Sequence, residues 1–160
     1  MKLLLVFIAS LILLSCEDHR DNKKIFPEQL TGQWRNVYLR IELNSYKNSD
    51  SNRVLEVTEQ NWERQMGIRP VRTYYWSDGT YNSEHLNLND SVFYNPAGHW
   101  KLIGDSLYMN DTFPSRDAHY TYKVTLNGDM AEFSGMEDCD NDGRKDDLYY
   151  GTQRKFTGHE

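Results

Sequence analysis

The sequence predicts an all-β fold: a single antiparallel up-and-down β-barrel of about eight to ten strands, with one short helix after the second strand. Two observations lead to this prediction. Short segments of alternating apolar and polar residues follow one another, and turn dipeptides such as Asp78-Gly79 and Asn127-Gly128 separate them. Helix signals are scarce by comparison. A meander of hairpins leaves two exposed edges, and closure into a barrel removes them.

The expected elements follow one another along residues 26–160, which we assign to the barrel domain. Residues 37–43 alternate apolar and polar side chains, the pattern of a half-buried strand. The polar loop 44–52 leads to a short second strand at 53–57. The helical candidate, 58–67, has a threonine cap and a glycine stop. Further strands are expected at 71–77, 80–86, 98–103, 106–109, 119–126, 130–135 and 148–156.

The alternation also predicts which side chains enter the barrel. In segment 119–126, one face holds Tyr120, Tyr122, Val124 and Leu126. In segment 148–156, the face expected to point inward holds Leu148, Tyr150, Thr152, Arg154 and Phe156. Arg154 would then point with the apolar side, where a charged group needs a partner.

The N-terminus has the features of an export signal. Lys2 precedes an apolar run at 3–14, which is shorter than the roughly 20 residues that a membrane span needs. Leu13-Leu14-Ser15-Cys16 resembles a bacterial lipobox. That resemblance implies a signal peptide at 1–15 and a lipidated Cys16 followed by a flexible tether at 16–25. The alternative is an ordinary signal peptide with a chance cysteine.

Lipidation at Cys16 would anchor the protein to a membrane, since two or more acyl chains give stable attachment. We therefore expect an outer-membrane lipoprotein of the bacterial envelope, facing the periplasm or the cell surface. The chain has 18 Lys and Arg against 24 Asp and Glu, a formal net charge of −6. This acidity argues against nucleic-acid binding. The second cysteine, Cys139, would have no disulfide partner within the chain, and we expect a monomer.

An acidic segment near the C-terminus has the spacing Asp138-x-Asp140-x-Asp142-Gly143-x-x-Asp146. Carboxylates at positions 1, 3 and 5 of a loop converge, and a glycine at position 6 allows the sharp turn. The backbone carbonyl of Arg144 would be a further ligand, and Asp147 could supply an alternative oxygen. Oxygen ligands favour calcium over transition metals, so we predict a structural calcium site. The alternative is a solvated Asn-Asp-Gly turn.

Three motifs resemble the lipocalin-like (calycin) lipoproteins of bacteria: Leu30-Thr-Gly32-Gln-Trp34, Trp76-Ser-Asp-Gly79-Thr-Tyr81, and Gly98-His-Trp100-Lys-Leu-Ile-Gly104-Asp-Ser-Leu-Tyr108. The resemblance covers roughly residues 28–157. It implies a barrel that binds a small apolar or amphipathic ligand. It also implies that a basic residue of the last strand, here Arg154, packs over Trp34 and closes one end of the barrel.

Three functions remain open from the sequence. The first is a lipid-anchored binder of a small ligand, and the second is an envelope interaction protein with a filled barrel. The third is a small hydrolase, but the chain has no Gly-x-Ser-x-Gly elbow and no histidine pair of the zinc type. We therefore predict that the protein is not an enzyme.

Overall fold

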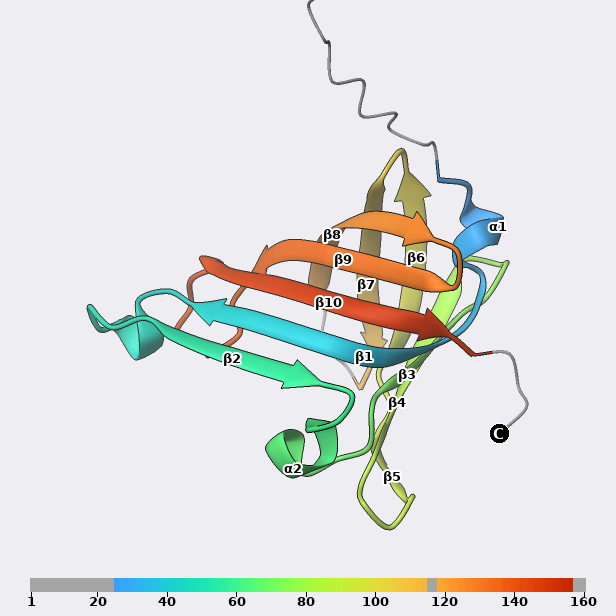
Figure 1. The fold of residues 1–160 in the computed structure, drawn as a ribbon. Coiled ribbons are helices and arrows are strands. Elements are labelled where there is room, and N and C mark those ends of the chain that lie inside the picture. The colour runs from blue at the N-terminus through green and yellow to red at the C-terminus, as the bar shows by residue number, and fades with distance from the viewer. Residues whose placement is uncertain (1–24, 115–117, 157–160) are drawn as a thin grey trace, which may run out of the picture.

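The protein folds as a closed antiparallel β-barrel (Figure 1). The computed structural model describes residues 25–114 and 118–156. Their strands are β1 (Gly32–Leu43), β2 (Arg53–Thr58), β3 (Arg72–Tyr75), β4 (Thr80–Leu86), β5 (Val92–Tyr94), β6 (Ala97–Ile103), β7 (Ser106–Phe113), β8 (His119–Asn127), β9 (Met130–Glu137) and β10 (Asp147–Lys155). The sequence prediction of an all-β antiparallel barrel is confirmed.

Eight of the strands close the barrel in the order β1, β3, β4, β6, β7, β8, β9, β10, and β10 pairs again with β1. The two other strands extend it: β2 pairs with the second half of β1, and β5 pairs with the end of β4. Gly79 and Gly128 have φ angles of 83° and 62° in the β3–β4 and β8–β9 turns, a backbone region that glycine enters without strain. No helix in the described part of the chain is long and apolar enough to cross a membrane.

The helix after the second strand is present but shorter than predicted. It is α2 (Trp62–Met66), and Gly67 ends it with a left-handed φ of 67°. Thr58, the predicted cap, instead pairs with Tyr38 as the last residue of β2. A second helix that the sequence did not predict, α1 (Pro27–Leu30), precedes β1. Figure 1 shows α2 beside the β4–β5 hairpin and away from α1.

A β-bulge interrupts β1 at Val37. The pairing with β10 skips this residue, running from Asn36↔Gln153 to Tyr38↔Thr152. Because a bulge inserts one extra residue, it shifts the alternation of side chains between the two faces of the strand. Trp34 and Leu39 are both buried, although regular alternation would place residues i and i+5 on opposite faces.

The inward face of β10 is displaced by one residue from the prediction. Asp147, Gly151 and Gln153 are buried, whereas Arg154 is opposite Arg35 and pairs with Glu59 at 3.2 Å. The even-numbered face is therefore on the outside, where Tyr150 contacts Tyr38 at a centroid distance of 5.8 Å. The face predicted for β8 is confirmed, because Val124 is 1% exposed and its neighbours in sequence are exposed.

The core has two parts. The larger cluster fills the barrel near α1, and its buried members are Ile25, Leu30, Trp34, Tyr75, Tyr81, Trp100, Leu107, Val124, Ala131 and Phe133. Ile25, which the sequence placed at the end of the tether, thus belongs to the core. The smaller cluster joins Leu39, Val57 and Trp62 beneath α2. The space between the two clusters is a cavity.

Candidate functional site

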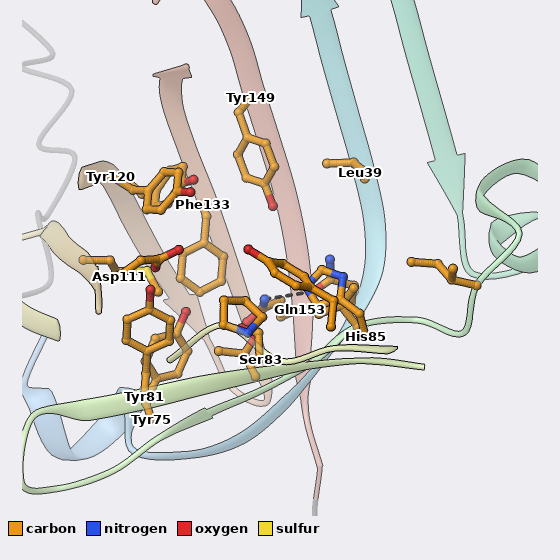
Figure 2. Close-up of a pocket in the computed structure, with 18 of the residues that line it drawn as sticks. Leu39, Tyr75, Tyr81, Ser83, His85, Asp111, Tyr120, Phe133, Tyr149 and Gln153 are labelled. Atoms are coloured by element: carbon orange, nitrogen blue, oxygen red, sulfur yellow. Dashed lines mark hydrogen bonds between the residues drawn. The ribbon is translucent and has the colours of Figure 1, made fainter. Parts of the chain in front are cut away.

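The barrel contains a cavity of about 380 Å³ that is partly open to solvent. Its wall is formed by side chains of α2, of the segment after it, of seven barrel strands, of β5 and of the link from β5 to β6: Asn36, Leu39, Trp62, Met66, Ile68, Val71, Thr73, Tyr75, Tyr81, Ser83, His85, Tyr94, Pro96, Met109, Asp111, Tyr120, Tyr122, Phe133, Tyr149 and Gln153. Figure 2 shows labelled side chains from several strands around this space. Its volume lies within the range of small-ligand sites, about 300–1,000 Å³.

Polar groups form one side of the cavity. Gln153 Nε2 donates to Asn36 Oδ1 at 2.8 Å, and both side chains are buried. The hydroxyls of Thr73 and Ser83 are 3.0 Å apart and share a hydrogen bond. The β1 bulge and the register of β10 bring Asn36 and Gln153 face to face. The cavity therefore has an ordered polar wall in addition to its aromatic side chains.

Two buried polar atoms of the lining residues have no hydrogen-bond partner within residues 25–114 and 118–156. They are the acceptor Gln153 Oε1 and the donor Trp62 Nε1. Most buried polar groups in folded proteins are paired, so each unpaired group marks a place where a ligand or a water can bind. Trp62 is 1% exposed and Gln153 is 8% exposed.

Four ionisable groups of the wall, three tyrosines and a histidine, remain uncharged near neutral pH. Burial raises the pKa of Tyr149 to about 12, with smaller contributions from Cys139 and Glu137. Burial likewise raises the pKa of Tyr75 and Tyr122, so all three phenols keep their protons. Burial lowers the pKa of His85, which leaves its imidazole neutral at pH 7.

The sequence predicted this site only in part. The aromatic face of β8 indicated Tyr120 and Tyr122, which line the cavity. Asn36 and Gln153 gave no signal, because polar residues on a strand normally indicate the solvent face. An inward Gln or Asn becomes visible only once the bulge and the strand register are known.

The closure of the barrel end differs from the prediction in one residue. Lys155, rather than Arg154, lies over Trp34, with its Nζ 5.3 Å from the ring centroid. Lys155 is directly opposite Trp34 in the β1–β10 register, and its Nζ also donates to the carbonyl of Gln29 at 3.1 Å. A basic residue of the last strand thus covers the tryptophan, but it is the neighbour of the one predicted.

The acidic segment folds against the β1–β2 loop. Asp147 is 1% exposed, and its carboxylate accepts hydrogen bonds from the backbone N–H groups of Asn44 and Cys139, both at 2.8 Å. Asp140 accepts one from Lys47, and Asp142 accepts one from Asn48. These hydrogen bonds connect two loops that are about one hundred residues apart in the sequence.

The donor loop has an unusual backbone. Ser45, Lys47 and Asn48 all have positive φ angles, between 47° and 60°. Backbone N–H groups in such turns form concave nests that bind anions. The carboxylates of Asp140 and Asp142 occupy this position, so backbone dipoles of the β1–β2 loop offset part of their mutual repulsion.

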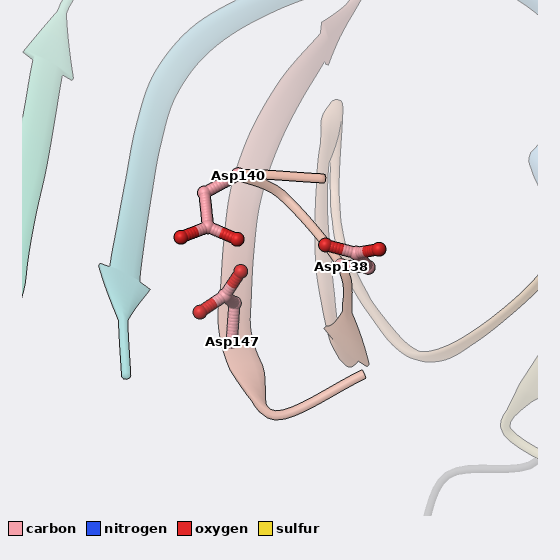
Figure 3. A group of neighbouring side chains, drawn as sticks. All are labelled: Asp138, Asp140 and Asp147. Carbon is pink, nitrogen blue, oxygen red and sulfur yellow. The ribbon is translucent and has the colours of Figure 1, made fainter. Parts of the chain in front are cut away.

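Three of the acidic side chains converge closely enough to hold a metal ion. One oxygen each from Asp138, Asp140 and Asp147 lies within 4.8 Å of the others (Figure 3). Calcium binds oxygens at about 2.3–2.6 Å, so two ligands on opposite sides of one ion are about 5 Å apart. Asp147, the alternative oxygen of the sequence analysis, therefore joins two of the predicted ligands.

The other predicted carboxylate ligands, Asp142 and Asp146, do not belong to this converging group. Asp142 accepts a hydrogen bond from the Arg144 backbone N–H at 2.9 Å, and Asp146 accepts one from the Ser45 hydroxyl at 2.9 Å. The ligand role of the Arg144 carbonyl stays a prediction. Cys16 and the signal segment 1–15 lie outside the described residues, as does most of the tether 16–25.

Comparison with known proteins gave one solved structure to report. No protein-family model and no curated protein matches the chain. The chain is similar to a lipocalin-like protein from Bacteroides uniformis, with 13% sequence identity and a TM-score of 0.47. The match covers 80% of this chain and 99% of that chain. The barrel described above rests on the strand pairing of this chain itself, and membership of the lipocalin-like family stays a prediction.

Proposed function

We propose that the protein is a lipid-anchored envelope lipoprotein that binds a small amphipathic molecule inside its barrel. One observation carries this proposal: the cavity of about 380 Å³ between the two core clusters, lined by hydrogen-bonded polar groups and by aromatic and aliphatic side chains. Its size and its mixture of apolar rings with a few polar groups are typical of small-ligand sites. Anchoring through Cys16 follows from the lipobox resemblance.

The two alternatives have less support. A filled barrel that acts only as a docking surface would have side chains where this cavity lies. A hydrolase would need an acid or base poised for proton transfer. Within the described residues, His85 is the histidine that lines the cavity. Burial lowers its pKa, and no carboxylate contributes to that shift.

Ser83→Phe is expected to weaken ligand binding at least tenfold, because Ser83 lines the cavity and a phenyl ring would occupy it. Binding is measured with the mature chain, residues 16–160, carrying Cys16→Ser so that no detergent competes. The probe is N-phenyl-1-naphthylamine, an uncharged molecule whose fluorescence rises in apolar surroundings.

Asn82→Phe is the matched control for this prediction. Asn82 is the preceding residue of β4, and its side chain is on the outside, where it accepts a hydrogen bond from Trp76. It should leave probe binding unchanged. Equal affinity of the two variants, or no probe binding by the unaltered chain together with no copurified small molecule in native mass spectrometry, would rule out the cavity as the site.

We also propose that the acidic segment binds calcium and that the ion has a structural role. Support comes from the convergence of Asp138, Asp140 and Asp147 and from the all-oxygen ligand set. Calcium is plentiful outside the cytoplasm, where the export signal would direct the chain. A bound ion would join the acidic segment to the start of β10 and so close the last hairpin of the barrel, in a protein whose Cys139 is a free thiol.

Calcium at about 10 mM is expected to stabilise the mature chain by about 1–3 kcal/mol, if its affinity is that of weak extracellular sites. Asp140→Asn should abolish this gain, because it removes one converging carboxylate. Asp129→Asn, in the exposed β8–β9 turn, should keep it. Thermal unfolding with calcium or a chelator measures the effect, and identical curves for the unaltered chain in both conditions would refute calcium binding.

A further inference from the structure

The polar wall of the cavity offers one acceptor that the protein itself leaves unused. Gln153 Nε2 is fixed by its hydrogen bond to Asn36, shown as a dashed line in Figure 2. Its Oε1 is buried and has no partner in the described part of the chain. Because the amide is held on one side, its carbonyl is presented in a fixed orientation. A bound molecule whose N–H or O–H group reaches this oxygen therefore gains a hydrogen bond.

The charges around the cavity disfavour anions. Within the described residues, the lining contains no lysine or arginine. Apart from the tyrosines, its ionisable side chains are Asp111 and His85. Burial keeps His85 neutral at pH 7. A carboxylate in this cavity would lose its hydration and meet no cation of the wall, which is a costly position for a charge.

Aromatic rings form part of the remaining surface, together with apolar side chains such as Leu39 and Met109. Tyr75 and Tyr81 lie with their ring centroids 6.4 Å apart, and Tyr122 and Tyr149 lie 5.2 Å apart. Ring pairs of this kind favour a planar aromatic guest, which can pack against the face of one ring and the edge of another. Trp62 lines the same cavity and has an unpaired Nε1 donor, so a carbonyl on the guest has a partner available.

Resting on the proposed ligand-binding function, we infer that the cavity selects uncharged aromatic ligands that donate an N–H or O–H to Gln153, and that it excludes carboxylate anions such as fatty acids. An aromatic primary amide has the required chemistry, because it supplies a planar ring, an N–H donor and a carbonyl acceptor. The corresponding carboxylate has nearly the same shape but lacks the donor and carries a negative charge.

The test compares three probes on the mature chain with Cys16→Ser. They are 1-naphthaleneacetamide, its isosteric anion 1-naphthaleneacetate, and 1-methylnaphthalene, which has neither charge nor donor. Each competes with N-phenyl-1-naphthylamine at pH 7.5. The amide is expected to bind at least tenfold more tightly than the acetate, because only the amide has a donor for Gln153 and only the acetate brings a charge into a wall without lysine or arginine.

Gln153→Met is the variant that removes the acceptor with little change in side-chain volume. It should weaken the amide at least fivefold and change 1-methylnaphthalene less than twofold, and circular dichroism checks that the variant is folded. Equal weakening of both probes would overturn the role of Gln153. If Gln153→Met does not fold, the amide-to-acetate ratio of the unaltered chain still decides the inference.

The failure of this inference differs from the failure of the proposed function. Acetate binding as tight as amide binding would overturn the selectivity and leave a ligand-binding barrel. Absence of binding by all three probes and by N-phenyl-1-naphthylamine, with no copurified small molecule, would overturn the proposed function and the inference with it.

Discussion

Trp34→Ala is expected to lower the free energy of unfolding by about 3–5 kcal/mol. Trp34 is 1% exposed, and it is one of the two largest fully buried side chains in the described residues. Its Nε1 donates to the Leu30 carbonyl at 2.7 Å, and Lys155 lies over its ring. Truncation would leave a cavity at the end of the barrel, an unpaired carbonyl and an ammonium without its aromatic partner. Urea unfolding followed by circular dichroism measures the loss.

Trp76→Ala is the control for this experiment. Trp76 is 51% exposed and stacks on Tyr74 outside the barrel, with a centroid distance of 5.8 Å. Its truncation should change stability by less than about 1 kcal/mol, as most surface substitutions do. Similar losses for the two variants would contradict the view that the junction of α1, β1 and β10 holds the barrel closed.

Local signals were sufficient to predict the fold class. Turn dipeptides such as Asp78-Gly79 depend on the conformational freedom of glycine, and the structure has hairpins at these positions. The alternation in β8 also placed its faces correctly, because no bulge interrupts that strand. These features depend on residues close together in the sequence. They can therefore be read without knowing the rest of the fold.

The faces of β1 and β10 could not be read in the same way. The bulge at Val37 changes which side chains of β1 point inward, and the sequence around it has no glycine or proline to mark it. In β10 the apolar residues Leu148 and Tyr150 are on the outer face, whereas Gln153 is inside. A simple rule that apolar residues point inward therefore gives the wrong face of β10. It predicts that Arg154 packs over Trp34, whereas Lys155 does so in the structure.

The candidate site was hidden for a related reason. The hydrogen bond between Gln153 and Asn36 joins residues 117 positions apart. The partners of the acidic segment are likewise distant, since Asn44, Lys47 and Asn48 come from the other end of the domain. A loop template considers only the spacing within the segment. It identified the carboxylates but not the backbone donors that orient them, nor the central position of Asp147.

Asp147→Ala is expected to lower the free energy of unfolding by about 2–5 kcal/mol in the presence of a chelator. The change leaves two partly buried backbone N–H groups, those of Asn44 and Cys139, without an acceptor, and each unpaired group costs about 1–3 kcal/mol. The carboxylate is the direct connection between the acidic segment and the β1–β2 loop. Asp147→Asn should lose less, because its amide oxygen can still accept one hydrogen bond.

Asp138→Ala separates the hydrogen-bonding role of Asp147 from its metal-binding role. The donors to Asp138, the N–H groups of Asp142 and Gly143, belong to its own loop, where water can replace the carboxylate. In chelator this variant should therefore be nearly as stable as the unaltered chain. In calcium both variants should lack the added stability. If Asp138→Ala costs as much as Asp147→Ala without calcium, the loops are not joined through Asp147. If both variants keep the calcium gain, the converging carboxylates do not hold the ion, and backbone hydrogen bonds alone fasten the last hairpin to the barrel.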